Sequence, residues 1–135
     1  MLRTVDFKSK KYPPMMCRSL LSGGIRKNQY NEFVHSVFKF TDKDFASIAG
    51  TSVRTLSRLK DDQNIPVQAA EVTISLMRAF SRAAEIFGSE ESAVKWLKMP
   101  NSVLEGLSPV QALGSRFGAE EVMDMLGRIE NGVYS

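Results

Sequence analysis

Residues 40–59 read FTDKDFASIAGTSVRTLSRL, and this stretch decides the fold. Thr41 and Asp44 have the spacing of a capping box, so we expect a helix to begin at Asp42. Gly50 accepts a left-handed backbone without steric cost, and we expect it to end that helix. The residues after the glycine resume a helical pattern. The stretch therefore predicts a helix, a tight turn and a second helix.

The second helix has the surface of a DNA-recognition helix. Ser52 is a good N-cap, and the helix is predicted to run to about Lys60. Small and aliphatic residues stand where a helix-turn-helix motif needs them, namely Ala46, Gly50, Leu56 and Leu59. The residues expected to contact DNA bases or phosphates are Ser52, Val53, Arg54, Thr55, Ser57, Arg58 and Lys60. An ordinary helical hairpin is the alternative interpretation, and Thr51, where an aliphatic residue is commoner, departs from the motif.

Charge is divided unevenly along the chain. Residues 1–60 contain 12 Lys and Arg and 4 Asp and Glu, a net charge of +8. Residues 61–135 contain 6 and 11, a net charge of −5, so the whole chain carries +3. A basic N-terminal part suits a polyanionic partner and favours DNA binding over an ordinary hairpin.

The rest of the chain shows helical periodicity and no strand-like alternation. We expect helices across residues 30–38, about 69–87 and 90–99, a helix start at Ser108-Pro109-Val110-Gln111, and a last helix that ends at Asn131-Gly132. Gly118 is expected to close the segment that begins at Ser108. Glu120 and Glu121 are expected to lie at the positive end of the last helix. The sequence therefore predicts an all-α fold.

The residues needed for catalysis or metal binding are missing from the sequence. It offers no nucleophile paired with a base, no spaced metal ligands and no glycine-rich phosphate loop. The chain has one cysteine, Cys17, and one histidine, His35, which we interpret as a solvated surface residue. No apolar run is long enough to span a membrane, and no signal peptide is recognisable. We expect a cytoplasmic protein with no enzymatic activity, no cofactor, no metal and no membrane contact.

The C-terminal part carries a specific set of residues. They are Ala93, Trp96-Leu97, Pro100-Asn101, Gly106, Ser108-Pro109, Gly118, Val122, Leu126 and the ending IENGVYS of residues 129–135. Together with residues 40–59, this part resembles the Xre/MbcA/ParS group of bacterial antitoxins. It is most similar to the Xre antitoxins that are paired with RES-domain toxins. The resemblance covers roughly residues 30–135.

The resemblance implies a division of labour along the chain. The C-terminal region would bind and inhibit a toxin that consumes NAD, while the helix-turn-helix would repress the promoter of the shared operon. Residues 26–65 would form a DNA-binding region and residues 66–135 a helical dimerisation and toxin-binding region. Residues 1–25 lie outside the resemblance, and because they show no sustained period we expect them to form a basic lead-in arm. The expected partners are the cognate RES-domain toxin, operator DNA and a second copy of the chain.

The tail of the chain is the expected toxin-binding segment. Its residues are Asn131, Gly132, Val133, Tyr134 and Ser135. Val133 and Tyr134 are apolar, and we expect another surface to bury them. The resemblance favours a tail that enters the NAD cleft of the toxin, and the alternative is a tail folded on the protein's own core.

Two other functions compete with that of an antitoxin and autorepressor. One is a stand-alone transcription regulator whose C-terminal half dimerises or senses a small molecule. The other is a protein-binding inhibitor whose helix-turn-helix no longer binds DNA.

Overall fold

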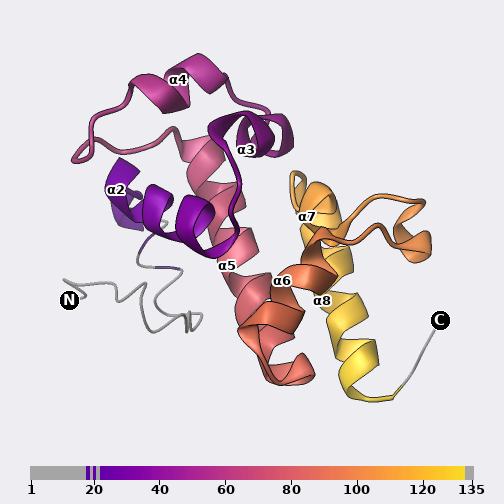
Figure 1. The fold of residues 1–135 in the computed structure, drawn as a ribbon. Helices are drawn as coiled ribbons and strands as arrows, with labels where there is room; N and C mark the ends of the chain where they lie inside the picture. Colours follow the sequence, from indigo (N-terminus) through magenta and orange to yellow (C-terminus); the bar gives the residue numbers. More distant parts are fainter. Residues whose placement is uncertain (1–17, 19, 21, 133–135) are drawn as a thin grey trace.

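Every regular element in the described part of the chain is a helix. The structure is a computed structural model that describes residues 18, 20 and 22–132. Its elements are α2 (Lys27–Tyr30), the π-helix η1 (Asn31–Val37), α3 (Asp42–Ala49), α4 (Val53–Arg58), α5 (Val67–Phe87), α6 (Glu90–Lys98), the 3-10 helix η2 (Ser102–Leu104), α7 (Pro109–Ala112) and α8 (Arg116–Glu130) (Figure 1). The expectation of an all-α fold is confirmed for these residues. Cys17 and most of the predicted lead-in arm lie outside them.

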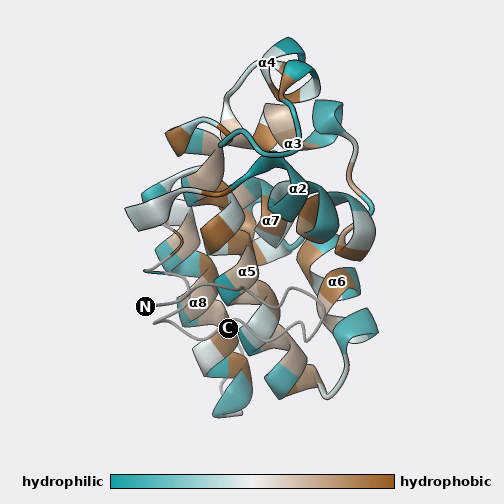
Figure 2. Cartoon of the chain, turned by 90° about the vertical axis from the view of Figure 1, so that its left-hand side faces the viewer, coloured by the Kyte–Doolittle hydropathy of each residue, from teal (hydrophilic) through white to brown (hydrophobic). Residues whose placement is uncertain are grey.

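The long helix α5 is the spine of the molecule. It contacts α3 on one side and both α6 and α8 on the other, and α7 joins α6, α8 and α3. Phe80 on α5 meets the rings of Phe33 and Phe38 at centroid distances of 6.1 and 5.5 Å. Figure 2 shows apolar residues concentrated along α5, in the interior, and hydrophilic residues on the outer turns. One continuous core therefore connects the N-terminal and C-terminal helices.

The helix boundaries predicted from capping residues are largely confirmed. Thr41 and Asp44 form the capping box of α3, with the backbone N–H of Asp44 donating to Thr41 Oγ1 at 3.1 Å. Gly50 follows α3 with φ of 69°, and Gly88 follows α5 with φ of 84°. Ser108 caps α7 in the same reciprocal way. The predicted helix, tight turn and helix are therefore present as α3 and α4.

Two predicted boundaries are wrong. Helix α4 ends at Arg58 rather than near Lys60, because Leu59 has an extended backbone. Gly118 lies inside the first turn of α8, where its N–H donates to Ser115 Oγ at 3.0 Å. Glu120 and Glu121 therefore stand beyond the first turn of α8 instead of at its positive end.

Close backbone contacts hold the C-terminal helices together and against α3. A Cβ atom on Gly118 would lie 1.9 Å from the carbonyl oxygen of Ala112, the last residue of α7. A Cβ atom on Gly114 would lie 2.4 Å from the carbonyl oxygen of Ile48 in α3. Both glycines are needed because real side chains do not fit at these distances.

Lys39 has an unusual backbone between η1 and α3. Its φ is 61°, in the left-handed region that glycine prefers. The turn is a helix stop, in which the N–H of Lys39 donates to the carbonyl of His35 and that of Phe40 to the carbonyl of Val34, both at 3.1 Å. A residue with a Cβ atom costs about 1 kcal/mol at such a position relative to glycine.

The segment between α4 and α5 is anchored to the start of the N-terminal helices. The N–H of Lys27 donates to the carbonyl of Gln63 at 2.7 Å, and that of Ile65 to the carbonyl of Ile25 at 2.8 Å. The sequence predicts that residues 61–66 connect the two regions. In the structure they lie between α4 and α5, where backbone hydrogen bonds hold them.

Candidate functional site

Helix α4 presents the residues that the sequence predicts for DNA contact. Its described neighbours bury only Leu56, and the predicted contact residues Ser52, Val53, Arg54, Thr55, Ser57, Arg58 and Lys60 are all exposed. Lys60 follows the end of the helix. Two hydroxyls already have partners, because Ser52 Oγ accepts from the N–H of Thr55 at 3.3 Å and Ser57 Oγ donates to Asp42 at 3.0 Å. The two guanidinium groups, of Arg54 and Arg58, are the charged groups that α4 offers to solvent.

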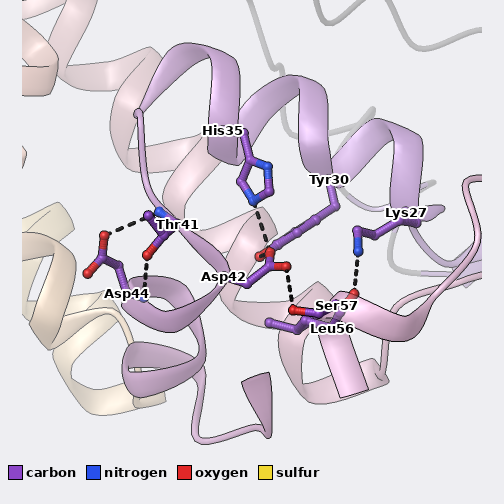
Figure 3. A network of polar contacts seen from close by, with 8 residues as sticks. All are labelled: Lys27, Tyr30, His35, Thr41, Asp42, Asp44, Leu56 and Ser57. Atoms are coloured by element: carbon purple, nitrogen blue, oxygen red, sulfur yellow. Dashed lines mark hydrogen bonds and ion pairs between the residues drawn. The ribbon is translucent and has the colours of Figure 1, made fainter. Parts of the chain in front are cut away.

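Asp42 links α4 to the helices beneath it (Figure 3). Its Oδ1 accepts from the hydroxyl of Tyr30 at 2.9 Å and lies 2.9 Å from His35 Nε2, while its Oδ2 accepts from Ser57. Burial raises the pKa of the Asp42 carboxyl, but hydrogen bonds from Tyr30, Ser57 and His35 outweigh burial and hold the pKa below its usual value. One carboxylate thus joins α2, η1, α3 and α4.

Lys27 contacts the same C-terminal half of α4, at the residue before Ser57. Its side chain is buried, with 5% of the residue exposed, and Nζ donates to the backbone carbonyl of Leu56. An ammonium group near the last carbonyls of a helix is favourable because these carbonyls carry partial negative charge. The ring of Tyr30 lies 6.0 Å from Nζ, and burial raises the pKa of the Tyr30 hydroxyl. Lys27 and Asp42 therefore hold the C-terminal half of α4 against the N-terminal helices.

The sequence interpretation of this region missed the contacts of Lys27, Tyr30 and Asp42 and the partner of His35. The side chain of His35 is 36% exposed, and its ring pairs with the carboxylate of Asp42. The four side chains come from α2, η1 and α3 and converge only in the folded chain. No local pattern in the sequence predicts their meeting.

Replacing Asp42 by alanine is expected to destabilise the protein by about 2 kcal/mol. The carboxylate is mostly buried, with 17% of the side chain exposed, and its loss leaves the Tyr30 hydroxyl without its acceptor. Urea unfolding followed by circular dichroism measures the change. Asp62→Ala, on the exposed connection, is the control and should have little effect. Equal stability of Asp42→Ala and the wild type would show that the network contributes nothing.

The same network gives an acid dependence. Because the folded pKa of Asp42 is lowered, its stabilisation is present above the unfolded pKa of about 3.9 and is lost as the pH falls through the folded value. The difference in stability between wild type and Asp42→Ala should therefore shrink below about pH 4.

A second candidate surface lies on the C-terminal helices. Large apolar residues are exposed on the loop between α6 and α7 and at the start of α8, namely Met99, Val103, Leu107 and Phe117. Phe117 is 75% exposed. Exposed apolar residues of this size indicate a surface that a protein partner covers.

The predicted tail begins at the end of the molecule opposite α4 (Figure 1). Asn131 is the C-cap of α8 and Gly132 follows with φ of 76°. Val133, Tyr134 and Ser135 lie outside the described residues. Arg82 on α5 holds the last turn of α8 through two contacts with Glu130, one of them Nη1 to Oε2 at 3.1 Å. The tail thus follows a helix end that Arg82 holds in place.

Two grooves lie beside these surfaces. One, of about 570 Å³, runs between α5 and the start of α8 and is lined by charges of both signs, including Arg78, Arg116 and Glu71. The other, of about 790 Å³, lies between α3, α6 and α7. Within the described ranges, no three residues could together hold a metal ion, and no helix is long and apolar enough to cross a membrane.

Comparison with known proteins finds a family match for the C-terminal helices. Residues 82–132 match the family described as the antitoxin Xre/MbcA/ParS C-terminal toxin-binding domain. The match begins in α5 and includes α6, α7 and α8. It contains Met99, Val103, Leu107 and Phe117.

Three relatives carry the name Antitoxin Xre. The protein from Photorhabdus laumondii is 27% identical over 135 residues, which cover 98% of this chain and 89% of the relative. The protein from Yersinia enterocolitica is 32% identical over 88 residues, 64% of this chain and 60% of the relative. The protein from Pseudomonas putida is 32% identical over 81 residues, 59% of this chain and 51% of the relative. Over residues 82–132 the chain is thus similar to the toxin-binding domain of the Xre/MbcA/ParS antitoxins, and its relatives over a longer stretch are Xre antitoxins.

Proposed function

We propose that the protein is the antitoxin of a toxin–antitoxin pair and has no catalytic activity of its own. The observation that carries this proposal is the match of residues 82–132 to a toxin-binding domain. The exposed apolar residues of the α6–α7 loop and of α8 support it, because they offer a surface for a protein partner. Co-expression with the adjacent gene product tests it. Rescue of growth and co-purification are expected, and failure of both would favour a stand-alone regulator.

We further propose that the toxin is of the RES type and consumes NAD. The resemblance of the C-terminal sequence to antitoxins paired with RES toxins supports this assignment. In the proposed complex, the tail of residues 131–135 enters the NAD cleft and competes with the substrate. NAD consumption by the purified toxin, measured with and without the antitoxin, is the assay.

The proposal includes binding of α4 to operator DNA and repression of the protein's own operon. Exposed Arg54 and Arg58, a rigidly held α4 and the net charge of +8 over residues 1–60 support it. A mobility shift on the upstream promoter at several salt concentrations tests it.

Arg54→Ala is expected to lower operator affinity by about 1 to 3 kcal/mol if Arg54 contacts a base. The side chain is exposed, so helix content should not change. Fluorescence anisotropy with operator and random DNA separates the outcomes. Equal loss on both DNAs would assign Arg54 to a phosphate, and no loss on either would exclude it from the interface.

We also propose that the protein self-associates. The single short helix α4 has six residues and provides few base contacts, while operators commonly mirror a two-fold axis. Sedimentation should show a dimer, free or on operator DNA. A monomer at every concentration in both conditions would contradict this.

A further inference from the structure

The groove between α3, α6 and α7 gathers three lysines from distant parts of the chain. Lys39 precedes α3, Lys43 lies in its first turn, and Lys98 is the last residue of α6. The polar side chains of Ser47, Ser108 and Gln111 line the same groove. This arrangement offers ammonium groups and neutral polar groups to one ligand.

The positive charge of this groove is only partly compensated by other residues of its lining. Among the residues that the structure describes, none of the three lysines forms an ion pair. Asp44 is the single carboxylate in the described lining, and it accepts from the N–H of Thr41 at 3.2 Å in the capping box of α3. Lys98 Nζ instead lies over the ring of Phe40, 4.7 Å from its centroid.

Burial is the main influence on the ammonium group of Lys98. Partial burial lowers the pKa of its ammonium group, Asp44 offsets part of this shift, and the charge of Lys39 adds to it. An anion in the groove would remove the repulsion between Lys39 and Lys98.

The backbone at Lys39 also needs an explanation beyond folding. A φ of 61° favours glycine, and a lysine there is less stable than a glycine in the same turn. Its side chain makes no ion pair among the described residues. The ammonium group of Lys39 therefore does not stabilise the fold through an ion pair among the described residues.

The groove adjoins the surface of α4. Asp42, the first residue of α3, bonds Ser57 on α4, and the next residue, Lys43, lines the groove. Figure 3 shows Asp44 on the side of Asp42 that faces away from Ser57. The start of α3 thus lies between α4 and the groove.

We propose that Lys39, Lys43 and Lys98 bind backbone phosphates of the DNA whose bases α4 contacts. This inference rests on the proposed DNA binding and extends the interface onto α6, within the part that matches a toxin-binding domain. Lysine ammonium groups act as point charges and bind phosphates without regard to base sequence. The groove would therefore add affinity and orientation, while α4 supplies the sequence preference.

The test uses the salt dependence of DNA affinity. Each phosphate contact contributes about 0.9 to the slope of log affinity against log salt concentration. Lys98→Gln and Lys43→Gln should each lower the slope by about this amount, equally on operator and random DNA. Arg128 lies in the last turn of α8, the end of this helix farthest from α4 (Figure 1). Arg128→Gln removes one charge there and should leave the slope unchanged.

Lys39→Gly separates folding from binding. Because glycine suits the backbone at this position, the variant should melt at a higher temperature than the wild type while its salt slope falls by about 0.9. If Lys39 had only a structural role, its replacement by glycine would change the melting temperature and leave the salt slope of DNA binding unchanged.

Four results would overturn the inference. If the slopes of the lysine variants stay unchanged while Arg54→Ala loses affinity, α4 binds DNA without the groove and only the inference is wrong. If the lysine variants lose the toxin but keep the slope, the groove binds protein. If the wild type binds pyrophosphate saturably, the lysine variants do not, and the slopes are equal, the groove takes a free phosphorylated ligand. A wild type that binds no DNA would remove the proposed DNA function and this inference together.

Discussion

Deletion of residues 131–135 is expected to abolish inhibition of the toxin. The proposed complex depends on the tail, in which Tyr134 acts as an aromatic anchor and the terminal carboxylate meets cationic groups that otherwise bind NAD phosphates. Removal of both opens the NAD cleft to substrate. NAD consumption by the toxin, measured at increasing antitoxin concentration, should show no inhibition by the truncated protein.

The fold should tolerate this deletion. Helix α8 ends at Glu130, and the contacts between Glu130 and Arg82 remain. The described backbone bonds that disappear are those from Asn131 to Gly127 and from Gly132 to Ile129. Helix content and operator affinity should therefore be nearly unchanged.

Tyr134→Ala provides a second, milder variant of the tail. It should weaken inhibition without shortening the chain. If the truncated protein unfolds, the tail belongs to the core of the protein. Full inhibition by the truncated protein would refute occlusion of the NAD cleft.

Gly118→Ala is expected to destabilise the protein by about 3 kcal/mol or more. The added Cβ atom would lie 1.9 Å from the carbonyl oxygen of Ala112, and this oxygen belongs to backbone rather than to a side chain that can rotate. Helix α8 must move away from α7, which disturbs the domain that matches the toxin-binding family. Thermal and urea unfolding measure the loss.

Gly127→Ala is the matched control on the same helix. No atom lies within 4 Å of a Cβ atom built at Gly127, so alanine should stabilise α8 by about 0.5 to 1 kcal/mol. We expect Gly118→Ala to lower the free energy of unfolding and Gly127→Ala to raise it. A neutral Gly118→Ala would mean that α7 and α8 separate at little cost.

Local signals explain what the sequence predicts correctly. The capping boxes at Thr41 and Ser108 and the helix stop at Gly88 depend on residues within one turn, so spacing alone reveals them. The exposure of Arg54 and Arg58 follows from the periodicity of α4 in the same way.

Contacts between distant segments explain what the sequence does not predict. Gly118 has the character of a helix stop, and only the position of Ala112 shows that it is needed for close packing. His35 has the spacing of a surface residue, and only the folded chain brings it to Asp42. Lys98 lies far along the chain from Lys39, so no local pattern could place both in one groove.

The continuous helix α5 fixes the distance between the two proposed partners. Its 21 residues span about 32 Å at the usual rise of 1.5 Å per residue. DNA bases at α4 and a toxin cleft at the end of α8 would stand at opposite ends of a stiff spacer, whereas a toxin that also covers Met99 would lie next to DNA phosphates at Lys98. Changing the length of α5 by one residue would also turn the toxin by about 100° around the helix axis relative to the duplex.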